Sequence, residues 1–186
     1  MFMNRRPTVL AFLFSIVLLT SGCADEPIAF SENVGLQLST MKANDVSNGS
    51  VTTEKNMNTE SGNPYGAFLK NAEENLDGAQ PSYVSITSAT IGLNSDSQGI
   101  SRLDQAFKLI ELFVSTSEAT VVLGSASSLS GPIANITIND DVDWNSLASV
   151  MTSGNFKLGL RCETGATTVK NWEATLFLDL SFSAYK

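Results

Sequence analysis

Apolar and polar residues alternate along most of the chain after residue 27. The first alternating run spans 28–38, and its apolar positions are Ile28, Phe30, Val34, Leu36 and Leu38. The clearest run spans 172–184, where every second residue is apolar and the residues between them are mostly polar. A period of two predicts a β-strand with one buried and one solvated face, which is typical of antiparallel sheets.

Shorter runs predict further strands at 83–93, 107–116, 119–123, 134–138 and 156–162. Within 83–93 the apolar parity changes between Ile86 and Ala89. Such a change moves the side chains to the other face of a sheet unless one residue is left unpaired. We therefore expect a β-bulge near Thr87–Ser88.

Two segments carry helix signals instead. Asn63 precedes Pro64 and an apolar pattern that stops at Gly78, which predicts a helix capped by the asparagine. Asp143 precedes the segment 144–151, and Gly154 follows it. A single helical turn is expected at 101–106. Both helices are short and would connect strands across the ends of sheets.

The segment 41–62 is polar and holds few apolar residues. Twenty residues without structure are unusual inside a compact domain. Two alternatives follow: a polar loop over the whole segment, or an edge strand near Ser50–Glu54.

Together these patterns predict an all-β fold, an antiparallel β-sandwich of the Ig-like or Greek-key type. It would contain about seven or eight strands and two short connecting helices. A small closed barrel is the alternative architecture.

The N-terminus has a different character. Arg5 and Arg6 precede an apolar run at 8–19, which is too short to span a bilayer of about 30 Å as a helix. Small residues follow it and lead to Cys23. This arrangement resembles the signal peptide and lipobox of bacterial lipoproteins.

The resemblance implies that residues 1–22 are a signal peptide and that Cys23 carries a diacylglyceryl group. Residues 23–27 would then be a short lipidated tether to one domain, 28–186. The residue after the cysteine is Ala24 where an aspartate marks many inner-membrane lipoproteins, which implies the outer membrane of a bacterial envelope.

Charge narrows the class of partner. The whole chain has a formal net charge of −8, and removing Arg5 and Arg6 with the signal lowers it to −10. Nucleic acids and anionic headgroups reward clustered lysine and arginine, and the sequence contains no such cluster. We therefore expect no nucleic-acid partner and attachment to the membrane through the lipid.

The sequence offers little catalytic chemistry. It contains no histidine, the commonest general base and a frequent zinc ligand. The segment 39–42 matches Ser-x-x-Lys without the accompanying motifs of penicillin-recognising enzymes. The acidic run 139–143 and the loop 94–99, with Gln105 at its twelfth position, only partly match a calcium loop. We interpret the acidic run 139–143 as a helix-capping turn and the loop 94–99 as a connection between strands.

Three apolar side chains remain to be placed. Cys162 shares a face with neighbouring apolar residues, so we expect it to be a buried core residue. Phe177 and Tyr185 lie on the polar side of the last strand. We expect a helix or a second sheet to cover these two aromatic side chains. The alternative is that they mark a surface that binds a ligand or partner.

These observations predict a non-enzymatic envelope lipoprotein that binds another envelope protein or a glycan, without a cofactor or metal ion. Two other hypotheses stay open. One is an envelope hydrolase with a serine or carboxylate site that the spacing does not reveal. The other is a passive structural lipoprotein.

Overall fold

Strands dominate the computed structural model, which describes residues 29–165 and 169–186. The first five strands are β1 (Ala29–Gln37), β2 (Met41–Lys42), β3 (Ser50–Met57), β4 (Tyr83–Leu93) and β5 (Phe107–Ser115). The other five are β6 (Thr120–Ala126), β7 (Ile133–Ile138), β8 (Phe156–Thr164), β9 (Glu173–Ala174) and β10 (Leu176–Tyr185). The helices are α1 (Pro64–Asn75) and α2 (Trp144–Ser153), with short 3-10 turns η1 (Ala43–Asp45) and η2 (Leu103–Gln105).

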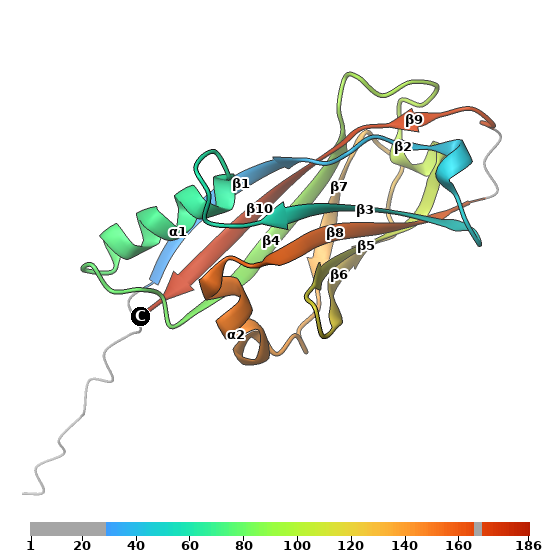
Figure 1. Cartoon of the computed structure of the whole chain (residues 1–186). Coiled ribbons are helices and arrows are strands. Elements are labelled where there is room, and N and C mark those ends of the chain that lie inside the picture. Colours follow the sequence, from blue (N-terminus) through green and yellow to red (C-terminus); the bar gives the residue numbers. More distant parts are fainter. Residues whose placement is uncertain (1–28, 166–168) are drawn as a thin grey trace, which may run out of the picture.

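Eight of these strands form one antiparallel sheet in the order β1-β10-β4-β7-β6-β5-β8-β3, and β2 pairs with β9. The sheet curls at β7, whose first four residues pair with β4 and whose last two residues pair with β6. The two halves therefore enclose a common core (Figure 1). The predicted all-β, antiparallel sandwich class with two helices is confirmed.

The core follows the alternation read from the sequence. On β10 the inward residues are at most 1% exposed, and they are Leu176, Leu178, Leu180, Phe182 and Ala184. Burying a side chain of leucine or phenylalanine size stabilises a fold by roughly 1.5–3 kcal/mol. This strand, which lies between β1 and β4, is thus a main source of packing energy.

Helix α1 fills one end of the sandwich with aromatic rings. The rings of Tyr65 and Phe68 lie 5.0 and 5.3 Å from the ring of Phe182 on β10. Tyr65 also meets Phe156 of β8 edge to face at 5.1 Å. Since β10 and β8 belong to opposite halves of the sheet, α1 joins the two halves.

Both helices begin where the sequence predicts. The side-chain oxygen of Asn63 accepts a hydrogen bond from the Tyr65 amide at 3.0 Å, and Pro64 occupies the first helical position. Asp143 caps α2 in the same way. Gly154 ends α2 with φ of 61°, a left-handed conformation that glycine adopts without strain.

The bulge is also confirmed. Ser88 pairs with Ser181 and Ile86 pairs with Phe182, so Thr87 is the extra residue on β4. The unpaired residue restores the alternation, and both Ile86 and Ala89 face the core.

The single strand expected at 172–184 is wrong in one respect. It is broken at Thr175 into β9 and β10. The Thr175 amide hydrogen-bonds to the Ser97 hydroxyl, and its carbonyl accepts from the Asn94 amide. The loop after β4 thus takes the bonds that would have continued the strand.

The segment 41–62 is not a continuous loop. It contains β2, η1 and the edge strand β3, which pairs with β8 along its whole length. The strand alternative is therefore correct, and it extends beyond the expected residues.

The two edges of the large sheet, β1 and β3, approach each other near the end of β1. The Lys55 ammonium donates to the Gln37 carbonyl at 3.2 Å, and the Thr53 hydroxyl donates to the Ser39 carbonyl at 3.4 Å. Side chains of β3 thus bond to backbone carbonyls at the end of β1 and just after it.

Candidate functional site

Cys23, the residue expected to carry the lipid, lies outside the residues that the structure describes. Lys42 ends the Ser-x-x-Lys segment 39–42, and its ammonium donates to the Glu173 carboxylate at 2.8 Å. This hydrogen bond and the charge of Glu173 raise the pKa of Lys42. A lysine that activates a serine must be neutral, so the shift is opposite to that role.

The acidic run 139–143 forms the predicted capping turn. One carboxylate oxygen of Asp143 accepts from the amides of Asn145 and Ser146 at 3.1 and 3.2 Å. In the loop before β5, the Gln105 side chain accepts from the backbone of Ser101 at 2.7 Å. Within the described ranges no three acidic or cysteine side chains gather in a way that could hold a metal ion.

Cys162 is a core residue, as expected. It is fully buried on β8, and burial raises the pKa of its thiol to about 12. A thiol of this kind is almost never ionised near neutral pH, and the thiolate is the nucleophilic form.

Phe177 and Tyr185 pack on strands of their own sheet, where cover by a helix or a second sheet was expected. Phe177 lies opposite Gly92 of β4, and its ring occupies the space that a side chain there would need. Tyr185 stacks on Tyr83 with ring centroids 4.4 Å apart and an interplanar angle of 5°. These contacts account for both rings on the outer face.

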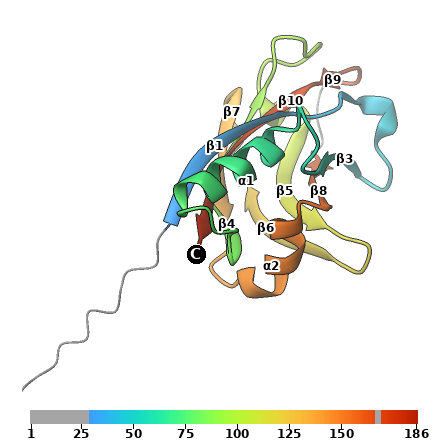
Figure 2. The same cartoon turned by 60° about the vertical axis from the view of Figure 1, so that its left-hand side comes forward.

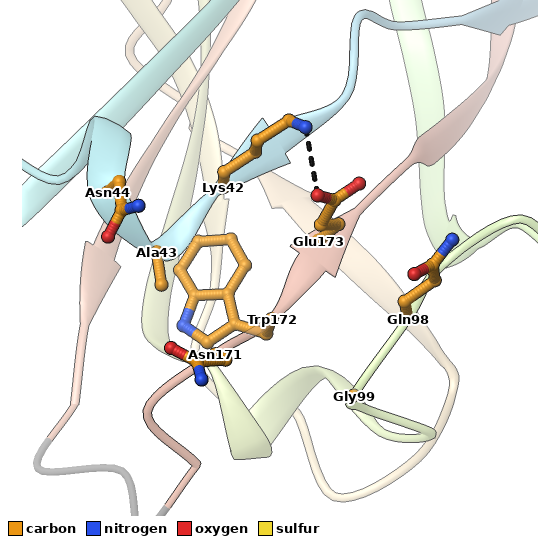
Figure 3. Close-up of a pocket in the computed structure, with 8 residues that line it drawn as sticks. All are labelled: Lys42, Ala43, Asn44, Gln98, Gly99, Asn171, Trp172 and Glu173. Carbon is orange, nitrogen blue, oxygen red and sulfur yellow. Dashed lines mark hydrogen bonds and ion pairs between the residues drawn. The ribbon is translucent and has the colours of Figure 1, made fainter.

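A pocket of about 360 Å³ lies at the end of the sandwich where β2 and β9 pair. Three separate segments line it, at 42–44, 98–99 and 171–173 (Figure 3). No prediction from the sequence brought these segments together. The sequence contains one local sign of this pocket, which is the run of an amide, an indole and a carboxylate side chain at 171–173.

Backbone hydrogen bonds on both sides of β9 hold the pocket together. The Ala43 amide donates to the Trp172 carbonyl at 3.0 Å. On the other side, Gln98 and Glu173 exchange two bonds of 2.8 and 3.0 Å. The loop comes so close that a Cβ on Gly99 would collide with the Asn171 carbonyl. The three segments are thus fixed relative to one another.

The interior of the pocket combines a packed base with a polar rim. The Trp172 side chain is nearly buried and meets Phe107 edge to face at 5.2 Å. The ion pair of Lys42 and Glu173 spans β2 and β9, with 52% and 40% of the two side chains exposed. Figure 3 shows the lysine chain above the indole ring.

Three carboxamides complete the rim, from Asn44, Gln98 and Asn171. All three residues are exposed, and none of these side chains makes a hydrogen bond to another described residue. A carboxamide both donates and accepts, which suits it to hydroxyl groups that do the same. The rim can therefore bind a neutral, hydroxyl-rich ligand and still offer one charge of each sign.

A second hollow of about 490 Å³ lies against α1, with Gly66, Leu69 and Pro81 in its lining. It is larger, and its polar side chains also come from several segments, such as Thr59, Lys70 and Thr152, but its lining contains neither an aromatic residue nor an ion pair between its members. The pocket at β9 is therefore the stronger candidate site.

No protein family matches the chain, and no curated protein is similar to it. Two solved structures align with nearly the whole chain at low similarity. One is described as Desmodium yellow mottle tymovirus, with 12% identity, a TM-score of 0.37, and coverage of 98% of this chain and 96% of that one. The other is the empty head of turnip yellow mosaic virus, with 8% identity, a TM-score of 0.32, and coverage of 98% and 90%. Likeness at this level carries no information about function.

A helix that crosses a bilayer needs about 20 consecutive apolar residues. Neither α1 nor α2 is long and apolar enough to cross a bilayer.

Proposed function

We propose that the protein is a non-catalytic, glycan-binding lipoprotein of the bacterial envelope. The observation that carries the proposal is the pocket at β9, where three carboxamides that bond to no other described residue lie beside an exposed ion pair. Polar groups that converge from separate segments are the usual basis of orientation and specificity in ligand sites.

The surface favours a glycan over a protein as ligand. Tight protein interfaces depend on a few buried aromatic or apolar anchors. Among the described residues, the exposed large hydrophobic side chains are limited to Ile133 on β7, which does not line the pocket. Hydroxyl-rich ligands need hydrogen-bonding partners instead, and the rim supplies them.

The lipid anchor is the second part of the proposal. Two or more acyl chains on Cys23 would hold the protein on the membrane, since one chain alone gives only reversible binding. Mass spectrometry of the native protein should find the acyl mass on Cys23. The Cys23→Ser variant should leave the membrane fraction.

Binding is tested by probing an array of bacterial and plant glycans with the labelled full-length protein. A glycan that binds is then titrated against the Gln98→Ala/Asn171→Ala double variant. Each lost hydrogen bond costs about 1 kcal/mol, so affinity should fall by roughly tenfold or more.

The matched control is the Gln80→Ala/Asn139→Ala variant, which removes the same two side-chain types from exposed positions outside the pocket. Its affinity should stay at the wild-type value. An array without binding, or equal affinity in the pocket variant and the wild type, contradicts the proposal. Covalent labelling by a fluorophosphonate probe would favour the hydrolase hypothesis.

A further inference from the structure

The two ends of the sandwich differ in their distance from the proposed anchor. Ala29, the first described residue, pairs with Tyr185, which in turn pairs with Tyr83. We call the end marked by these three residues the near end. Strand β1 has nine residues and leads from there toward the pocket. At about 3.3 Å per residue it covers roughly 26 Å.

The chain between Cys23 and Ala29 is shorter than that strand. Six Cα–Cα steps span at most about 20 Å even when fully extended. If the pocket end touched the bilayer with the strands upright, Ala29 would stand at least as high as the length of β1. The tether cannot bridge that height.

The near end has chemistry that suits the headgroup region. Tyr83 and Tyr185 form a stacked, half-buried pair, and the Ser82 amide is bonded to the Tyr185 carbonyl at 2.7 Å. Tyrosine concentrates at membrane–water interfaces because its ring is apolar and its hydroxyl is polar. The charge of Lys186 is paired with Asp77 at 3.4 Å.

Acidic side chains select the kind of lipid. Glu73 and Glu74 are exposed near the end of α1, which leads into the same end of the sandwich. They would be repelled by an anionic surface. A zwitterionic surface is the one that this end fits.

We propose that the near end rests on a zwitterionic lipid surface, with Tyr83 and Tyr185 at headgroup level, and that the pocket opens away from the bilayer. The inference rests on the proposed lipid anchor. Figures 1 and 2 both show the C-terminus and the start of β1 at the end opposite β9. The ligand of the pocket is therefore a glycan outside the supporting membrane and not a headgroup of that membrane.

Fluorescence quenching on vesicles tests this orientation. Gln80→Cys places a label at the near end and Gln98→Cys places one at the pocket, and both glutamines are exposed. Native Cys162 is fully buried and does not compete for a bimane label in the folded protein. Each labelled, acylated protein is bound to phosphatidylcholine vesicles that contain a headgroup spin-label quencher.

The label at position 80 should lose most of its fluorescence, and the label at position 98 should keep its intensity. Equal quenching of both labels would show a domain lying on its side, and stronger quenching at 98 would show the reverse orientation. Either result overturns the inference while the anchor stands. If the acylated protein does not sediment with the vesicles, the anchor fails and the orientation fails with it.

Discussion

Phe113 on β5 lies directly opposite Gly159 on β8, and its ring fills the space above the glycine. Phe177 and Gly92 repeat the arrangement between β10 and β4. An aromatic ring that covers a glycine on the neighbouring strand restores the packing that the missing side chain would provide. Each half of the sheet thus has one such pair.

Gly159→Ala should destabilise the protein. The new Cβ would collide with the Phe113 ring and lie 2.8 Å from the backbone oxygen of Thr53. Phe113 is only 5% exposed, so its ring has little room to move. Overpacking of this kind costs about 1–3 kcal/mol, measurable by urea unfolding.

Gly131→Ala is the control for that variant. Its nearest neighbours would be backbone atoms of Ile133 at 3.5 and 3.8 Å, which is ordinary contact. Its unfolding midpoint should match the wild type. Equal midpoints for both glycine variants would show that the ring does not restrict position 159.

Tyr65→Phe should lower stability in a pH-dependent way. The buried hydroxyl donates to the Met151 carbonyl at 2.8 Å, and that carbonyl also accepts from the Gly154 amide, so loss of the hydroxyl should cost about 0.5–1.5 kcal/mol at neutral pH. Burial raises the pKa of Tyr65 above its ordinary value of 10.0. The unfolded chain therefore releases this proton first, and the contribution of the hydroxyl is lost as pH rises above that value.

The measurement is the difference in unfolding free energy between wild type and Tyr65→Phe from pH 7 upward. The difference should be constant to about pH 9 and should shrink above about pH 10. A gap that widens in alkali would contradict the predicted direction of the shift.

Cys162 should be inert in the native protein. Its thiol is fully buried and its pKa is raised to about 12. In a Cys23→Ser background, a thiol reagent at pH 8 should react only as fast as the protein unfolds. Full labelling within the mixing time, without urea, would show that the thiol is accessible.

Asp143→Ala should cost about 1 kcal/mol, the usual value of a helix cap. Asp143 bonds to two amides at the start of α2, whereas Asp141 is exposed in the same turn. Asp141→Ala is therefore the control, with an unchanged thermal midpoint. Millimolar calcium should leave the midpoint of the wild type unchanged. An increase that depends on Asp143 would restore the calcium-loop interpretation.

Local patterns in the sequence predicted most of the fold. Alternation located the strands because one face of each is buried, as for Leu178 and Leu180 on β10. Caps located both helices because Asn63 and Asp143 bond to amides only two or three residues away. These interactions are contained within the segments that display them.

What the sequence did not predict depends on distant segments. The break at Thr175 arises from its bonds to the 94–97 loop, some eighty residues earlier in the chain. Strand β3 is polar on its solvated side, so the sequence indicated it only as one of two alternatives and only as far as Glu54. The pocket at β9 also depends on distant segments, because it needs the register of β2 against β9 and the position of Gln98.

The bonds from Lys55 and Thr53 to the backbone at the end of β1 bear on edge-to-edge pairing between neighbouring copies of the protein. An uncovered edge strand can pair with the edge of another chain and start aggregation. Here the facing edges are partly occupied by contacts within the same molecule. With the proposed lipid anchor in place, many copies could then stand close together on one membrane without their sheets joining into fibres.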